Sequence, residues 1–261
     1  MSDIAVIAAA SWKGAGYKQD DVPPDAPYAC YPLETCPEAL LPLPGGHTIL
    51  SRLVCQLRYF GFRAIFITVG PVGCRFHRVR ETHGRFVKEE QAALGDERSP
   101  WTWERLEYVR HLAIPIIVPN PDDFNFEESY VRALDTIGWD WDRLLLVHGD
   151  TVLTNRLLAR ALLEEPSVCV RLHPYHNLFW LTPEDAREYR NILASQSTDK
   201  AAKLAGYCTA IRERGVALVD VDTQWPEHKR DWRDVDYRGD YRAVAISPAH
   251  RSSWMEDYGH L

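Results

Sequence analysis

The sequence lacks the long apolar run that a membrane-spanning helix requires. Crossing a bilayer takes roughly 20 predominantly apolar residues, and no run in the 261 residues approaches that length. The N-terminus also lacks the basic segment of a secretory signal, because Met1, Ser2 and Asp3 lead directly into the short apolar run 4–10. We therefore predict a cytoplasmic protein with no membrane partner.

Metal-binding cysteine patterns are missing as well. The six cysteines include no Cys-x-x-Cys pair and no Cys/His set at zinc-binding spacing. This absence argues against a zinc knuckle and a dithiol redox motif, and we expect reduced, mostly buried thiols.

An excess of positive charge is also absent. The formal net charge is −7, whereas nucleic-acid binding relies on clustered Lys and Arg that neutralise phosphates. The one basic stretch, 75–88, is interrupted by Glu81, and we interpret it as a solvated helix face or a loop. We therefore predict no nucleic-acid partner.

Short apolar runs alternate with amphipathic segments along the chain. Strands separated by helices favour parallel pairing, with helices covering both faces of the sheet. We predict a three-layer α/β/α fold with a mixed, mostly parallel sheet, formed by residues 1–261 as a single domain. The expected strands are 4–8, 64–69, 114–118, 144–147, 168–172 and 216–221, and the expected helices are 48–60, 126–137, 154–163, one from 182 and a short one near 240.

Several residues mark where helices begin and end. Thr48 can cap the first helix and Gly61 can end it. Thr182 is followed by Pro183 and, three positions after the cap, by Asp185, a combination typical of a helix start.

The ligand of an open α/β sheet lies beyond the carboxyl ends of the strands, so the residues that directly follow each expected strand are the candidates for a site. The first expected strand runs into a loop that holds Gly14 and Gly16 between Lys13 and Lys18. Glycines let the backbone approach a phosphate closely and a lysine supplies opposite charge. An ordinary flexible turn would explain the same pattern.

Acidic residues follow two other segments. Asp150 comes just after the strand 144–147 and is preceded by Gly149, so its carboxylate could hold a hard cation or cap the next helix. Asp234, Asp236 and Asp240 form a second acidic run. Two carboxylates from separate strand ends can share one Mg²⁺. A solvated acidic turn, with Asp240 as a helix cap, is the alternative.

The order of these segments resembles the nucleotidyltransferases that activate sugars and related alcohols, including the sugar-phosphate nucleotidylyltransferases and the smaller cytidylyltransferases. The opening strand with Gly14-x-Gly16-x-Lys18 is similar to that family's glycine loop. Further similar segments are 37–43 (a Pro-Lys-x-Leu-Leu-Pro motif in the family), the metal-bearing Gly-Asp of 144–151, the strand and helix of 177–185, and the closing Asp-Val-Asp run of 234–240.

The resemblance implies a reaction and a site. The implied partners are a nucleoside triphosphate and a phosphorylated small molecule, and the implied cofactor is Mg²⁺, held by Asp150 and Asp236. Lys18, or Lys13 in its place, would stabilise the leaving pyrophosphate. The nucleotide would lie against the backbone at Ala9, Ala10, Gly14, Gly16 and Gly149.

One departure from the family leaves alternatives open. Glu38 stands where the family has a lysine that meets a phosphate, so either Lys13 or Lys18 substitutes, or the chain is an inactive relative that binds nucleotide. A glycosyltransferase that uses a nucleotide-sugar is the other alternative. Such enzymes usually carry Asp-x-Asp after the metal-bearing strand, whereas this chain has Asp140-Trp-Asp142 before it.

Overall fold

The computed structural model describes residues 3–9, 38–40, 43, 48–69, 76–82, 85–91, 112–117, 126–173, 176–194 and 213–234. Over these ranges none of the helices is both long enough and apolar enough to span a membrane.

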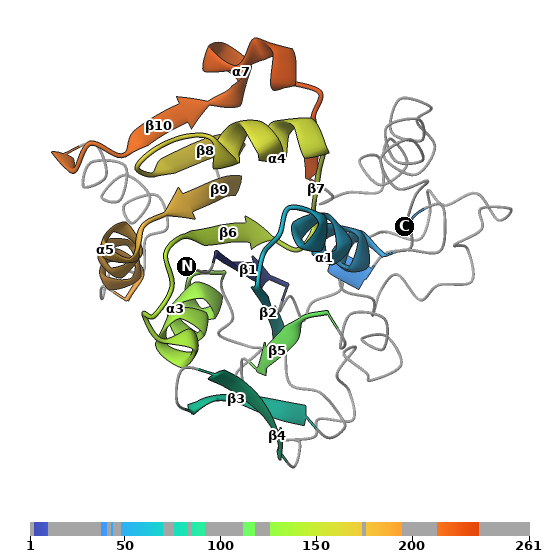
Figure 1. Ribbon diagram of the computed structural model, residues 1–261. Coiled ribbons are helices and arrows are strands. Elements are labelled where there is room, and N and C mark those ends of the chain that lie inside the picture. The colour runs from blue at the N-terminus through green and yellow to red at the C-terminus, as the bar shows by residue number, and fades with distance from the viewer. Residues whose placement is uncertain are drawn as a thin grey trace, which may run out of the picture.

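A seven-stranded sheet forms the centre of the described structure (Figure 1), in the order β10-β8-β9-β6-β1-β2-β5. Only β9 runs against its neighbours, while the other pairings are parallel. The strands are β1 (Ile4–Ala8), β2 (Ala64–Val69), β5 (Ile114–Ile117), β6 (Leu144–His148), β8 (Val168–His173), β9 (His176–Leu181) and β10 (Ala217–Asp220). The predicted mixed, mostly parallel sheet is therefore confirmed.

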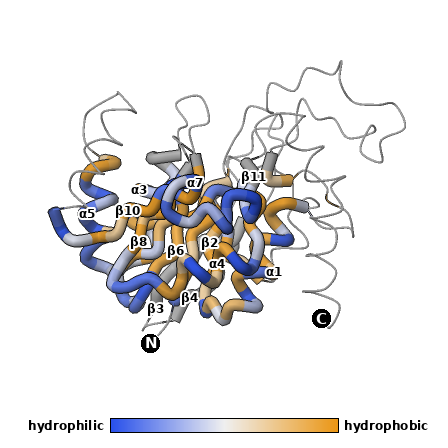
Figure 2. Tube along the Cα trace, turned by 90° about the horizontal axis from the view of Figure 1, so that it is seen from above, coloured by the Kyte–Doolittle hydropathy of each residue, from blue (hydrophilic) through white to orange (hydrophobic). Residues whose placement is uncertain are grey.

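Helices cover both faces of this sheet because successive side chains of a strand point to opposite faces. Ala5 and Ile7 of β1 pack in one core with α1 (Ile49–Tyr59), α4 (Asn155–Leu162) and α7 (Val221–Gln224). Ile4 and Val6 pack in the other core, with α3 (Phe126–Ile137) and α5 (Pro183–Leu193). Figure 2 shows the hydrophobic residues concentrated along the central strands. The predicted three-layer arrangement is confirmed.

The predicted helix boundaries follow from their caps. The Thr48 side chain accepts a hydrogen bond from the Ser51 amide, and the Ser51 side chain accepts one from the Thr48 amide, which closes a capping box at the start of α1. Gly61 has φ +84° just after that helix, a conformation that glycine adopts without strain. Thr182 caps α5, with Pro183 at its first position.

Other predictions were wrong or incomplete. Within the basic stretch 75–88, the described residues form a hairpin of β3 (Phe76–Thr82) and β4 (Arg85–Gln91) and not a helix or loop. A two-stranded ribbon of β7 (Thr151–Leu153) and β11 (Trp232–Asp234) was not predicted. The helix expected near 240 lies outside the described residues.

Candidate functional site

The carboxyl ends of β2, β1 and β6 lie side by side at one edge of the sheet. Ala8, at the end of β1, is aligned with Thr68 of β2 on one side and with His148 of β6 on the other. This is the edge at which an open α/β sheet binds its ligand. It is also where the sequence places Ala9 and Gly149, two of the predicted nucleotide-binding residues.

Gly149 packs tightly against the end of β1. Its amide donates a 2.8 Å hydrogen bond to the Ala8 carbonyl. A Cβ built on Gly149 would lie 2.7 Å from the Ala9 Cβ, 3.1 Å from the Ala9 Cα and 3.2 Å from the Ala8 oxygen. Only a residue without a side chain fits this approach. The structure therefore explains the glycine at 149 by its contact with Ala9.

Asp150 follows this contact at once and is half-buried. The alternative that it caps the next helix is wrong, because Thr154 caps α4 through a hydrogen bond from the Leu157 amide to its side chain. The Thr151 hydroxyl lies 3.4 Å from the Asp150 carboxylate, as a long hydrogen bond. The carboxylate of Asp150 therefore lies just beyond the carboxyl end of β6 and does not cap the start of α4.

Two buried aromatic rings lie beneath this edge. His148, which is 6% exposed, meets the ring of Tyr130 edge to face, with the ring centroids 6.0 Å apart. Burial raises the pKa of the Tyr130 hydroxyl well above its usual value, and the negative charge of Asp150 raises it further. Tyr130 therefore stays neutral and supports the end of β6 as a packed, polar-tipped ring.

The ribbon of β7 and β11 brings Asp234, the first residue of the second acidic run, close in space to Asp150. Asp234 pairs with Thr151, the residue directly after Asp150. The segment before β11 is fastened by a 2.6 Å contact between His228 Nδ1 and the Asp231 carboxylate, and by a 2.8 Å hydrogen bond from the Thr154 amide to the Asp231 carbonyl. Asp234 and Thr151, which are 83 positions apart in the sequence, are thus neighbours in the fold.

Most of the other predicted site residues lie outside the described ranges. These are Ala10, Lys13, Gly14, Gly16, Lys18 and Asp236. Glu38 opens a short 3-10 helix, η2 (Glu38–Leu40), whose Ala39 and Leu40 are buried in the same core as α1. Over the ranges that are described, no three His, Cys, Asp or Glu side chains gather as a metal-binding group.

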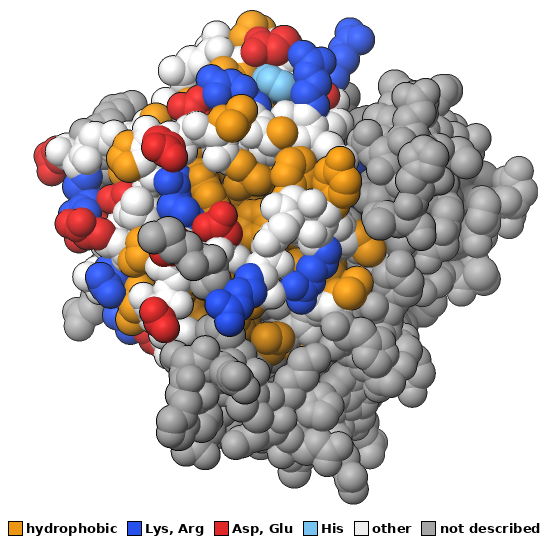
Figure 3. Space-filling model, viewed as in Figure 1, with side chains coloured by type: hydrophobic (Ala, Val, Ile, Leu, Met, Phe, Trp, Pro, Cys, Tyr) orange, Lys and Arg blue, Asp and Glu red, His pale blue; other side chains and the backbone are white. Residues whose placement is uncertain are grey.

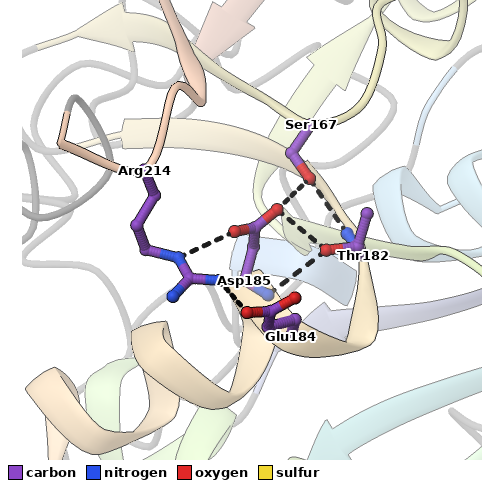
Figure 4. Close-up of polar contacts among 5 residues, drawn as sticks. All are labelled: Ser167, Thr182, Glu184, Asp185 and Arg214. Carbon is purple, nitrogen blue, oxygen red and sulfur yellow. Dashed lines mark hydrogen bonds and ion pairs between the residues drawn. The ribbon is translucent and has the colours of Figure 1, made fainter.

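A second polar cluster lies at the opposite edge of the sheet, since Leu181 at the end of β9 aligns with Leu144 at the start of β6. Asp185 is its centre (Figure 4). Ser167 and Thr182 donate hydrogen bonds of 2.6 and 2.8 Å to one carboxylate oxygen, and Arg214 donates to the other at 3.0 Å. This cluster joins β8, β9 and α5, so we assign it to the scaffold.

The described surface carries mixed charge. Figure 3 shows Lys and Arg side chains interspersed with Asp and Glu over the coloured part of this face. Ion pairs among the described residues include Arg190–Asp135 (2.9 Å) and Arg214–Glu184 (3.0 Å).

No family model matches the sequence, and no curated protein matches it. Solved structures do match. The CTP:phosphocholine cytidylyltransferase of Streptococcus pneumoniae superposes with a TM-score of 0.52 at 12% identity, over 94% of this chain and 98% of that one. The inositol-1-phosphate CTP transferase of T. maritima gives a TM-score of 0.53 at 12% identity, over 98% of this chain and 97% of that one. Rv0371c of Mycobacterium tuberculosis H37Rv gives 0.51 at 17% identity, over 95% and 98%.

The chain has the nucleotide-diphospho-sugar transferase fold. At these identities the likeness establishes the fold, and a shared fold does not by itself determine the chemistry. The sequence did not indicate that Thr68 or β11 lies near the predicted site. Thr68 stands in an apolar strand, and β11 is too short to give a clear strand pattern. Only the alignment of strands in space brings them to the edge where Ala9, Gly149 and Asp150 meet.

Proposed function

We propose that the chain transfers a nucleoside monophosphate from a nucleoside triphosphate to a phosphorylated small molecule and releases pyrophosphate. One observation carries this proposal: Gly149 packs on Ala9 at the carboxyl edge of β1 and β6, and Asp150 follows directly. A close backbone approach and a carboxylate at one strand edge suit a phosphate with its counter-ion. The solved cytidylyltransferase and CTP transferase that share the fold support this reading.

In the proposed reaction a phosphate oxygen of the acceptor attacks the α-phosphorus of the triphosphate. The bond from that phosphorus to the bridging oxygen breaks, and pyrophosphate leaves with the electron pair. No general base is needed because the nucleophile is already an anion, so positioning and electrostatics provide the catalysis. Backbone N–H groups at Ala10, Gly14 and Gly16 would bind the nucleotide phosphates, and Lys18 or Lys13 would stabilise the leaving pyrophosphate.

Asp150 and Asp236 are the residues that would hold Mg²⁺. Their donor set fits, since hard cations prefer carboxylate oxygens and Asp150 stands half-buried at the ligand edge. Asp234 pairs with Thr151, next to Asp150. Asp236 follows Asp234 by two residues, which span at most about 7 Å, and this short separation supports Asp236 as the second ligand. When bound, the ion would neutralise phosphate charge and align the displacement. The two carboxylates would hold the ion at a defined position relative to Ala9.

A screen for pyrophosphate release tests the proposal. The common nucleoside triphosphates are crossed with phosphorylated sugars and alcohols in the presence of Mg²⁺. Asp150→Asn should lower turnover about a hundredfold or more, the scale seen when one charge-stabilising group is removed. The matched control is Asp140→Asn, which changes an exposed acid at the other end of β6 and should leave turnover unchanged.

Two outcomes would count against catalysis. Equal activity in both variants would remove Asp150 from the site. Thermal stabilisation by a nucleoside triphosphate without pyrophosphate release from any acceptor would instead favour a nucleotide-binding relative, for which Glu38 at the family's lysine position is the supporting feature.

A further inference from the structure

Thr68 is a buried hydroxyl in an otherwise apolar strand. It is fully buried on β2 between Ile67 and Val69, which are also buried. A hydroxyl removed from water destabilises the fold unless it is hydrogen-bonded. Thr68 Oγ1 accepts a hydrogen bond from the Ala9 amide at 3.3 Å and donates a long one to the Ile7 carbonyl at 3.5 Å. The side chain therefore bonds the residues before and after Ala8, which is the last residue of β1.

This contact lies where the backbone ladder of β1 ends. Ala8 is the last residue of β1 that pairs with β2, so the amide of Ala9 needs a partner from elsewhere. Thr68 supplies that partner with its side chain. On the other flank the Gly149 amide donates to the Ala8 carbonyl at 2.8 Å. The chain at Ala8 and Ala9 is thus held from both neighbouring strands.

We infer that Thr68 is a positioning residue of the nucleotide site, which fixes where the chain leaves β1 for the phosphate-binding residues. The inference rests on the proposed function and deepens it. Ala9 uses its own amide on Thr68, so it does not donate that amide to the nucleotide. Its part is to set the starting point and direction of the residues that follow. The hydroxyl of Thr68 acts on the nucleotide through Ala9 and does not touch it.

Substitution at 68 tests this assignment. Thr68→Val keeps the shape and removes the hydroxyl, Thr68→Ser keeps the hydroxyl, and Thr68→Cys replaces it by a weakly bonding thiol in case the valine variant does not fold. The control is Thr182→Val, which removes a hydroxyl that caps α5 at the opposite edge. ATP, CTP, GTP, UTP and dTTP are each titrated with Mg²⁺ by calorimetry, and the one that binds wild-type protein most tightly is used for the variants.

The loss of one hydrogen bond predicts binding about five- to tenfold weaker in Thr68→Val, with the same rise in KM for the triphosphate and little change in KM for the acceptor. Thr68→Ser should bind within about twofold of wild type, and Thr68→Cys should lie between the two. Thr182→Val should lower the unfolding midpoint yet bind like wild type, which separates positioning from general destabilisation.

Two results would overturn the inference while leaving the proposed function standing. One is unchanged nucleotide affinity in Thr68→Val, or in Thr68→Cys if the valine variant is unfolded. The other is an equal loss of affinity in Thr182→Val, which would assign the effect to stability. If the wild-type protein binds none of the five triphosphates, the proposed function fails and this inference fails with it.

Discussion

Asp185 shows how single side chains keep a carboxylate charged inside this fold. Burial alone would raise the pKa of Asp185, but hydrogen bonds from Ser167, Thr182 and Arg214 outweigh that effect, so the pKa lies below its ordinary value. A lowered native pKa means that the ionised carboxylate stabilises the fold above the unfolded value of about 4. That stabilisation is lost as the pH falls through the native pKa.

Asp185→Asn should therefore destabilise the protein in a pH-dependent way. Near neutral pH we expect a loss of about 2 kcal/mol in the free energy of unfolding, because bonds to a charged acceptor are replaced by bonds to a neutral one. The gap between wild type and variant should narrow as the pH is lowered below about 4. Urea unfolding at a series of pH values measures it, with the exposed Asp140→Asn as control. A gap that does not change with pH would contradict this account.

Gly149 has no room for a side chain because Ala9 lies against it. Gly149→Ala places a Cβ 2.7 Å from the Ala9 Cβ, and overpacking of this kind costs about 1–3 kcal/mol. Combining it with Ala9→Gly removes the closest contact and should recover part of the loss, leaving the 3.1 and 3.2 Å backbone approaches. Denaturant midpoints of the two single variants and the double variant measure the coupling. Strictly additive losses would show that the clash is not the cause.

Side-chain caps at the first turn stabilise α1, α4, α5 and α7 in addition to their packing. In α1 the hydrogen bonds between Thr48 and Ser51 run in both directions, at 3.0 and 2.8 Å, and satisfy amides that a helix start leaves without partners. The buried face of α1 then packs on β1 and β2. The capping box therefore sets where α1 begins, and the sheet sets where it lies.

Thr48→Ala should cost about 1 kcal/mol of stability, as is usual for the loss of an N-cap. Ser51→Ala should cost a similar amount, and the double variant less than the sum, because the two side chains act as one box. Chemical denaturation of the three variants provides the measurement. If the two losses simply add, the reciprocal bonding in the structure does not contribute to stability.

The strand order determines which parts of the molecule meet. β1 lies in the middle of the sheet with β6 and β2 on its flanks, so segments that begin near residues 9, 68 and 149 converge at one edge. The β7–β11 ribbon adds residues near 234. A ligand bound at this edge would contact segments far apart in the sequence and would stabilise the folded state as a whole.

Ligand binding should therefore raise the melting temperature. At a hundredfold excess over its dissociation constant, a ligand specific for the folded state contributes about 2.7 kcal/mol, or about 5–10 °C for a chain of this size. We expect this shift with the preferred triphosphate and Mg²⁺, and a smaller one after chelation with EDTA. Asp150→Asn should make the shift insensitive to EDTA, whereas Asp140→Asn should behave like wild type. Calorimetric scans check each case.

The sequence alone determined the features that depend on neighbouring residues. Apolar runs placed the buried strands, and Thr48, Gly61 and Thr182 placed helix ends, because caps and periodicity act within a few residues. It also indicated that Asp150 follows a buried strand, since an acid after such a run lies at a strand end. The hairpin at 76–91 was missed because its alternation is masked by charged residues.

Only the tertiary structure decided what depends on residues far apart in the chain. It showed that Gly149 must be glycine because Ala9 lies against it, that Thr154 and not Asp150 caps α4, and that Thr68 bonds the amide of Ala9. It also set Asp234 beside Thr151. The physical reason is that strand order and register are fixed by the packing of the whole sheet, and no local stretch of sequence carries that information.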